Sequence, residues 1–244
     1  MKKCIYLLML SIAVVSFSCR DDSGDFEEQI FTNEQITLAL RDCIKVTSDT
    51  TINVLCIVDT LEKNIGYYYY SDSIYRIELS AAAKQVIDTL RAHEFENIAE
   101  INDSLIFNIN RGAEQCSKAI TDFWEPIIKN FSFPNPNKTL HGSNTAITDY
   151  VKATQQTELI NLMKNYTLKE NLTKLGVFTT WTMLLEEYYE ITGTFLTIDI
   201  LDYSVQQMVN GFFKEMALWE EKVREKPELR GKEDSWLYRV FATL

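Results

Sequence analysis

The sequence predicts a mainly α-helical protein built as a single multi-helix, bundle-like domain. Glycine (8) and proline (4) are scarce among the 244 residues, whereas a sandwich of short strands needs many turn residues. From Ser80 onward, apolar residues recur at steps of three and four, which is the spacing of one face of a helix. With 46% apolar residues, a chain of this length buries a core without disulfides or metals.

The first expected helix begins behind Ser80, whose hydroxyl suits an N-cap, and continues through Leu90. One longer amphipathic helix is expected over residues 98–127, because apolar residues keep the helical spacing throughout. A kink is expected in it near Pro126. Residues 133–137 (FPNPN) interrupt the pattern and predict a loop.

A further helix is expected to open at residues 142–145 (GSNT), with Asn144 as its N-cap. Helical spacing then continues to Gly176, which is a natural helix end. Three more helices are expected after it, over residues 177–192, 205–226 and 236–241.

A small β-hairpin is expected near residues 66–79. Residues 67–70 (YYYY) and 74–79 (IYRIEL) are rich in aromatic and β-branched side chains and are separated by a short polar turn. Because a two-stranded ribbon is only marginally stable alone, it should pack on the helices. The tyrosines are expected to pack against the core, although stacking on a sugar ring is an alternative.

The first residues resemble a lipoprotein signal peptide, residues 1–18. Lys2-Lys3 is a basic start, and residues 5–17 form an apolar run that is too short to span a membrane, which needs about 20 residues. Residues 16–19 (SFSC) resemble a bacterial lipobox, which predicts that Cys19 is lipidated and becomes the mature N-terminus. A plain secretory cleavage nearby is the alternative.

The polar residues that follow, 19–30, predict a flexible tether, and residues 31–244 predict the single folded domain. The acidic run in residues 20–25 resembles the surface-export signal of some bacterial lipoproteins. We therefore expect a lipid anchor in the outer membrane, and favour the cell surface over the periplasmic face. The expected partners are the membrane, through the lipid, and an unknown small ligand or envelope protein.

The mature chain is strongly acidic. Removing residues 1–18 takes away only Lys2 and Lys3 of 24 basic residues and none of 35 acidic ones, so the net charge falls from −11 to about −13. This balance argues against a nucleic-acid partner, which is bound largely through Lys and Arg. It also argues against adhesion to anionic lipid through a basic face.

Three cysteines remain in the expected mature domain after Cys4 leaves with the signal and Cys19 takes the lipid: Cys43, Cys56 and Cys116. Their number is odd and there is no C-x-x-C pair, so neither a disulfide framework nor a zinc site is indicated. Buried free thiols are expected, with a Cys43–Cys56 bridge as the alternative.

Several short segments together resemble the motifs of one bacterial family, the DUF4197 proteins. Residues 109–114 (INRGAE) are similar to its MNRAAE motif, and residues 142–150 (GSNTAITDY) to its G-x-D-T-A-A-T-x-Y segment. Further similar pieces are residues 201–203, residues 210–213, the set Glu221, Arg224 and Pro227, and residues 240–241. The order and spacing hold from about Ile36 to Phe241. The resemblance implies a helical exported domain, often a lipoprotein, with no established activity.

The chain departs from the family pattern in three places. Residues 77–80 lack both prolines of the family's I-x-I-P-L-P piece. Pro134 and Pro136 interrupt the helix that the family places before the second motif, and the connection over residues 48–64 looks longer than usual. If these parts line a pocket, its contents here should differ.

The candidate polar pocket consists of residues at or near the matched motifs: Asn110, Arg111, Glu114, Thr145, Thr148, Tyr150, Glu221 and Arg224. Arg111 and Glu114 are also spaced for a simple helical ion pair, and the threonines for satisfying the first-turn amides behind Asn144. That same turn could bind an anion. A structural polar network is favoured over a ligand site.

Other charged positions predict solvated or structural roles. Glu186, Glu187 and Glu190 share a helix face opposite apolar residues, so a solvated face is expected. Glu221 and Arg224, with Arg230, are expected to form ion pairs at a helix end.

The histidines, His93 and His141, lie in unrelated segments, and no nucleophile, phosphate-loop or cofactor motif is evident. We therefore predict no catalytic residue, metal or cofactor. A non-catalytic binding or interaction module of the cell envelope is favoured. An envelope hydrolase using carboxylates such as Glu114, and an assembly or scaffold protein, are the alternatives.

Overall fold

The computed structural model describes residues 31–56 and 73–244, and these belong to one compact unit, Phe31–Leu244. Its α-helices are α1 (Asn33–Leu55), α2 (Ala81–Ala92), α3 (Ile98–Glu114), α4 (Ser117–Asn130), α5 (Pro136–Leu140), α6 (Ala146–Leu162), α7 (Leu168–Lys174), α8 (Val177–Thr192), α9 (Ile200–Glu225) and α10 (Trp236–Phe241). A π-helical turn, Met163–Thr167, joins α6 to α7, and a 3₁₀ turn, Pro227–Leu229, follows α9. The predicted mainly helical, single-domain fold is confirmed.

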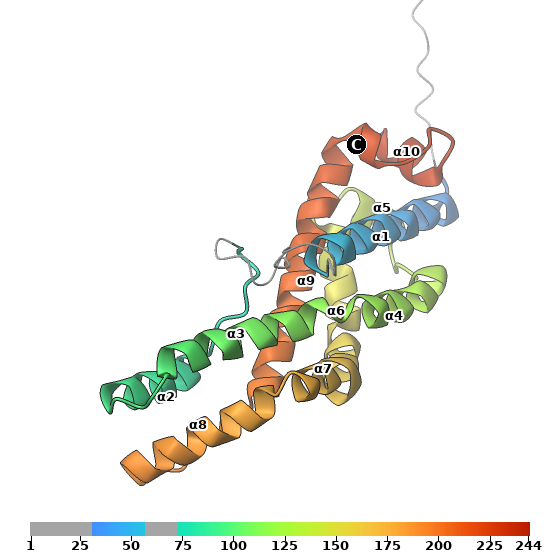
Figure 1. Cartoon of the computed structure of the whole chain (residues 1–244). Coiled ribbons are helices and arrows are strands. Elements are labelled where there is room, and N and C mark those ends of the chain that lie inside the picture. Colours follow the sequence, from blue (N-terminus) through green and yellow to red (C-terminus); the bar gives the residue numbers. More distant parts are fainter. Residues whose placement is uncertain (1–30, 57–72) are drawn as a thin grey trace, which may run out of the picture. The chain divides into compact units, whose positions relative to one another are not determined.

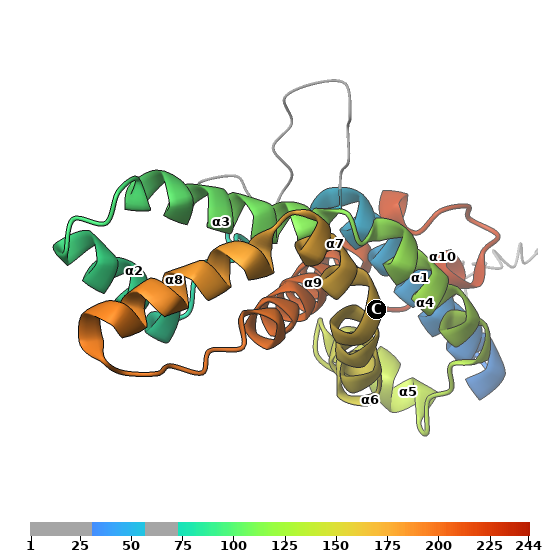
Figure 2. The ribbon, with the colours of Figure 1, turned by 60° about the horizontal axis from the view of Figure 1, so that its bottom comes forward.

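Helix α9 connects two groups of helices within the unit (Figure 1). One group consists of α1, α4, α5, α6 and α10, with α1 in contact with each of the others. The second group consists of α2, α3, α7 and α8, which contact one another along α3 and α8. Figure 2, from another side, shows the same two groups on either side of α9. Both groups of helices therefore pack against α9.

Buried aromatic side chains form the contact between α9 and α4. Phe212 and Phe213 are buried and meet Trp124 of α4, whose ring stacks on Phe212 and stands edge-on to Phe213. Burial of an aromatic side chain removes a large apolar surface from water, so this cluster is a main source of stability where α4 meets α9.

Several predicted helix ends are confirmed. Ser80 caps α2 by accepting a hydrogen bond from the Ala83 amide. Gly176 and Gly193 adopt positive φ angles of 72° and 68°, which glycine tolerates best, and they lie on either side of α8. Helix α9 ends at Glu225, shortly before Pro227.

The prediction of one helix over residues 98–127 is wrong. The chain breaks into α3 and α4 at Gln115 and Cys116, and α4 continues past Pro126. At the break, the Gly112 carbonyl accepts hydrogen bonds from the Asn171 side chain (3.0 Å) and the Cys116 thiol (3.3 Å). The Cys116 amide turns instead to the Ala113 carbonyl, which tightens the last turn of α3.

The N-terminal helix α1 was not predicted. Residues 48–55, expected to belong to a connection, are the last part of this helix. Helix α1 continues to Leu55 through a run of Thr and Ser, residue types that compete with the helical backbone. Here the hydroxyls of Thr47 and Thr50 donate to carbonyls four residues earlier, at 2.8 and 2.7 Å, within the helix. Residues 57–64 lie outside the described residues.

Two smaller expectations are also corrected. The predicted hairpin is not found in the described part of the chain: residues 73–79 contain no strand, and residues 66–72 lie outside it. The expected loop at 133–137 is shorter than predicted, because Pro136 occupies the first turn of α5, where its missing N–H costs nothing. No helix within residues 31–56 and 73–244 is both long and apolar enough to cross a membrane.

Candidate functional site

Asn110 holds the extended segment before α2 against α3. Its carbonyl oxygen accepts a hydrogen bond from the Ile77 amide (2.9 Å), and its amide nitrogen donates to the carbonyls of Ile77 (2.9 Å) and Ile106 (2.8 Å). The side chain is fully buried. Asn110 therefore satisfies the backbone of Ile77 as a neighbouring strand would, which explains how this segment is held without a sheet.

Glu114 is fully buried at the end of α3 and forms an ion pair with Arg111, with 2.8 Å between Nη1 and Oε2. The Arg111 side chain retains 22% exposure. Burial, and to a lesser extent the negative charge of Glu114, raises the pKa of the nearby Cys56 thiol to about 12. Burial likewise raises the pKa of Cys116. Glu114 thus lies near the buried, protonated Cys56 thiol and is itself fully buried.

Glu220 of α9 occupies the N-terminus of α6. Its two carboxylate oxygens accept hydrogen bonds from the amides of Ile147 (3.1 Å) and Thr148 (2.7 Å), and the Arg224 guanidinium lies 2.9 Å from it. Burial raises the pKa of Glu220, whereas Arg224 and the two amides act in the opposite direction. The anion that a helix N-terminus attracts is supplied here by the chain itself.

Arg224 extends this network to the end of α5. Its Nη1 donates to the Leu140 carbonyl at 2.8 Å and its Nη2 lies 3.4 Å from the Thr139 carbonyl. Arg224 and Glu220 therefore fasten α9 to both α5 and α6. The ion pair expected between Glu221 and Arg224 is formed by Glu220 instead, and Glu221 is only half-buried. Arg230 donates to the Val223 carbonyl at the end of α9.

The remaining candidate residues lie around the first turns of α6. The N-cap is Thr145 and not the predicted Asn144, and the Thr145 hydroxyl donates to Asp149 (2.9 Å). Thr148 is buried beside Glu220. The half-buried Tyr150 ring packs against Phe131 and Phe133. The structure therefore places the eight candidates in two groups, one at the end of α3 and one at the junction of α5, α6 and α9.

Glu215 is a third buried carboxylate, after Glu114 and Glu220, and neither Glu215 nor Glu220 is among the predicted site residues. Glu215 accepts hydrogen bonds from the Tyr75 hydroxyl and from the Trp219 indole (2.8 Å). The sequence spacing could have indicated that Glu220 is buried. Glu220 stands four residues after Met216 and three before Val223, and both of these are buried on the core face of α9. A charged residue on an apolar stripe predicts a buried and therefore partnered charge.

The cysteines are free and buried, as expected: Cys43, Cys56 and Cys116 form no disulfide. Within the described residues, no three His, Cys, Asp or Glu side chains are grouped so as to hold a metal ion. The predicted solvated face of α8 is confirmed for Glu186 and Glu190, which are exposed.

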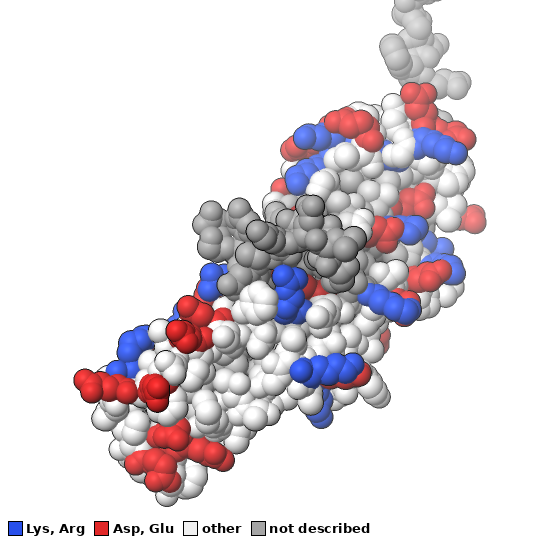
Figure 3. All heavy atoms as spheres, viewed as in Figure 1, with Lys and Arg blue, Asp and Glu red and all other residues white. Residues whose placement is uncertain are grey.

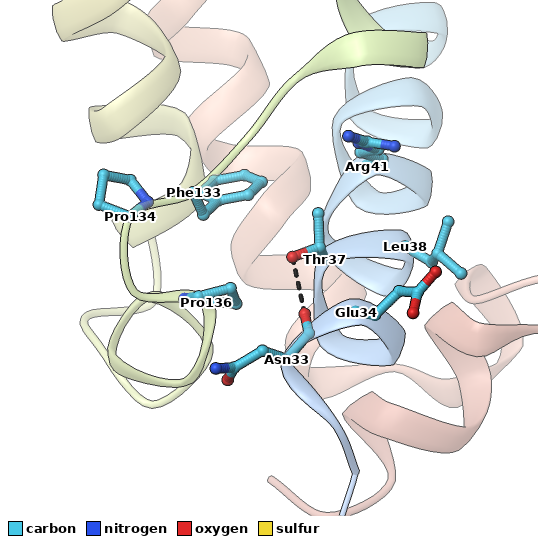
Figure 4. Close-up of a pocket in the computed structure, with 8 residues that line it drawn as sticks. All are labelled: Asn33, Glu34, Thr37, Leu38, Arg41, Phe133, Pro134 and Pro136. Carbon is cyan, nitrogen blue, oxygen red and sulfur yellow. Dashed lines mark hydrogen bonds between the residues drawn. The ribbon is translucent and has the colours of Figure 1, made fainter.

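An open hollow of about 420 Å³ lies between α1 and the residues that lead into α5 (Figure 4). Its lining comes only from these two segments: Asn33, Glu34, Thr37, Leu38, Arg41, Phe133, Pro134 and Pro136. Arg41 supplies a positive charge, but its Nε already donates to the Phe131 carbonyl at 2.6 Å. None of the eight predicted site residues lines this hollow.

The family suggested by the sequence motifs is confirmed by comparison with known proteins. Residues 31–242 match the family described as "Protein of unknown function (DUF4197)". No curated protein and no solved structure matches the chain.

Proposed function

Because this chain belongs to the DUF4197 family, whose description names no activity, we propose its function from the site and the N-terminal sequence. The protein is a cell-envelope lipoprotein, held in the outer membrane by lipid on Cys19. Its helical domain is a non-catalytic binding or interaction module. The basic residues Lys2-Lys3, the apolar run of residues 5–17 and the small residue before Cys19 support the anchor.

The observation that supports binding over catalysis is the use the fold makes of its buried acids. A general acid or a nucleophile must reach the reacting atoms of a substrate. Glu220 instead caps α6 and pairs with Arg224, and Glu114 is fully buried and paired with Arg111. The contacts of Glu220 and Arg224 join α9 to α5 and α6, and the Glu114–Arg111 pair lies within α3, so each has a structural role.

The anchor is tested by replacing Cys19. We expect Cys19→Ala to move the protein from the membrane fraction to the soluble fraction, and the mature wild type to carry an N-terminal mass with acyl chains. Cys4→Ala is the matched control, because Cys4 lies in the expected signal peptide and should leave partition unchanged. Unchanged membrane partition of Cys19→Ala would show that the anchor is wrong.

The non-catalytic role is tested against the hydrolase alternative with a panel of envelope polymers, namely peptidoglycan, glycans and phosphate esters. We expect no turnover by the purified wild type. Turnover that is lost in Glu114→Gln but kept in Glu100→Gln, an exposed position on the same helix, would establish a hydrolase and overturn the proposal. The folded state of each variant is checked by circular dichroism. Self-association in light scattering would favour the scaffold alternative.

A further inference from the structure

The most exposed large apolar side chain in the described part of the chain is Phe195, which keeps 79% of its surface in water. Its ring stacks on Tyr189 of α8, with 3.9 Å between the ring centroids and 19° between the planes. Gly193, with its positive φ, turns the chain at the end of α8, and the Thr194 amide donates to the Thr192 hydroxyl (3.1 Å). This turn brings Phe195 back over α8.

Acidic residues outnumber basic ones in the segments at the same end of the unit as this aromatic pair, where α2 contacts α8. Residues 81–103, which include α2 and the start of α3, together with the α8 end at residues 186–193, contain eight acids: Asp88, Glu94, Glu96, Glu100, Asp103, Glu186, Glu187 and Glu190. The same segments contain two basic residues, both already paired: Arg91 with Asp88 at 2.7 Å and Lys84 with Glu78 at 4.0 Å. Figure 3 shows acidic side chains gathered at this end of the unit.

This acidic end lies away from the place where the chain enters the unit. The first described residue, Phe31, packs edge-on against Trp236 of α10, with 6.4 Å between centroids. In Figures 1 and 2, α10 and the free ends of α2 and α8 lie at opposite ends of the unit. The end of α8 that carries Tyr189 therefore lies away from Phe31 within the unit.

We propose that this surface, the Tyr189–Phe195 stack with its acidic surroundings, docks a basic segment of another envelope protein. An apolar side chain of the partner covers the free face of Phe195, and its Lys or Arg side chains face Glu186, Glu190 and the acids of α2 and α3. Exposed aromatic side chains are typical interface hot spots, and complementary charge directs the encounter. The inference rests on the proposed function, because it names the partner of that binding module.

The charge distinguishes this partner from other occupants. A second copy of the chain would bring two acidic surfaces together, which is repulsive. A neutral glycan could stack on Phe195, but it gains nothing from an excess of eight acids over two paired bases. A cationic protein segment uses both the ring and the charges.

The test is a binding titration of the purified full chain with a short synthetic peptide of alternating Lys and Phe, followed by fluorescence anisotropy. An otherwise identical Glu and Phe peptide is the control probe. We expect the Lys peptide to bind, with an affinity that weakens as salt rises. Phe195→Ala should weaken the binding at least about tenfold, and the double change Glu186→Gln with Glu190→Gln should reduce its salt dependence.

Tyr166→Ala is the matched control, because Tyr166 is also an exposed aromatic (68%) but lies in the π-helical turn after α6. It should bind as the wild type does. Equal affinity of Phe195→Ala and wild type, salt-independent binding, competition by a neutral glycan, or self-association that requires Phe195 would each overturn the inference. None of these outcomes bears on the lipid anchor or on turnover. The proposed function is tested separately, by membrane partition of Cys19→Ala and by the substrate panel.

Discussion

A buried carboxylate needs strong partners, and Glu220 finds them in an arginine and two helix amides. Through Glu220 and Arg224 together, the resulting network joins α5, α6 and α9. The sequence motif around residues 142–150 is therefore accounted for by structure: its first turn is arranged to receive Glu220. Replacing Glu220 should accordingly affect folding.

We expect Glu220→Gln to lower the free energy of unfolding by about 3 kcal/mol, because it leaves the Arg224 charge buried without its partner. Urea denaturation measures the effect. Glu125→Gln is the matched control: Glu125 pairs with Lys129 in the same i,i+4 arrangement but is 67% exposed. It should cost about 0.5 kcal/mol or less. An equally small effect at Glu220 would show that the network does not stabilise the fold.

The buried thiols give a pH dependence with a defined sign. The pKa of Cys56 is about 12 in the folded protein, against an ordinary value of 9.0. The folded chain therefore holds this proton where the unfolded chain releases it, so the contribution is fully present below pH 9 and is lost as the pH rises toward 12. Cys56 should thus cost the wild type about 1.4 kcal/mol of stability per pH unit above pH 9.

Cys56→Ala removes this contribution and is compared with the wild type by denaturation at neutral pH and at about pH 10. The difference in unfolding free energy between the two proteins should shrink at the higher pH. A difference that is independent of pH would mean that Cys56 titrates normally, and hence that it is accessible to water.

At the scale of elements, the junction of α3 and α7 depends on the absence of a side chain at Gly112. A Cβ placed there would lie 2.5 Å from Cδ2 of Leu172 and 3.4 Å from Cδ1 of Leu168. Both leucines are fully buried. The same glycine offers its carbonyl to Asn171 of α7, so the two helices meet closely where α3 ends.

Gly112→Ala should lower the unfolding free energy by about 1 kcal/mol, because the clash with Leu172 exceeds the gain in helix propensity. In a Leu172→Ala background the same change should be neutral or stabilising, because the methyl group then enters the space left by the leucine. Denaturation of the four proteins of this cycle gives the coupling energy. Additive effects would contradict the close approach.

The sequence predicted those helix ends that are set by a residue at or next to the end itself. Ser80 before an apolar stripe, Gly176 and Pro227 each act on the backbone within a turn, so their effects are readable from neighbouring residues. The break between α3 and α4 carries no such signal, because apolar spacing continues through it and its cause is Asn171, 59 residues away from Gly112. Local periodicity cannot show a contact of that range.

The candidate site shows the same limit of local signals, because the structure places its eight residues in two groups. The sequence favoured a structural polar network for these residues, and Asn110, Glu114 and Arg224 each make specific buried contacts. Their grouping into one pocket assumed that matched motifs meet in space. The partner of the α6 turn is Glu220, 72 residues from Thr148, and its neighbour Glu221 was chosen instead. One residue along a helix turns a side chain by about 100°, from the core toward water.

For the whole molecule, the two ends of the helical unit differ in character. One end holds α10, against which Phe31 packs; at the other end, where α2 and α8 lie, acidic side chains gather (Figures 1 and 3). Tyr189 of α8 stacks there on the exposed Phe195. Buried polar residues between the two ends stabilise the helix junctions. This distribution is the basis of the binding surface that we propose at the end of α8.

The central claim, that the exposed end binds a basic partner in the envelope, is tested most directly by photo-crosslinking in living cells that produce the protein. A photoreactive phenylalanine analogue is placed at position 195, with position 166 as the control. We expect one adduct of defined mass from position 195, none from position 166, and loss of the adduct when Glu186 and Glu190 are changed to Lys. The same adduct from both positions, or no adduct at position 195, would contradict the account.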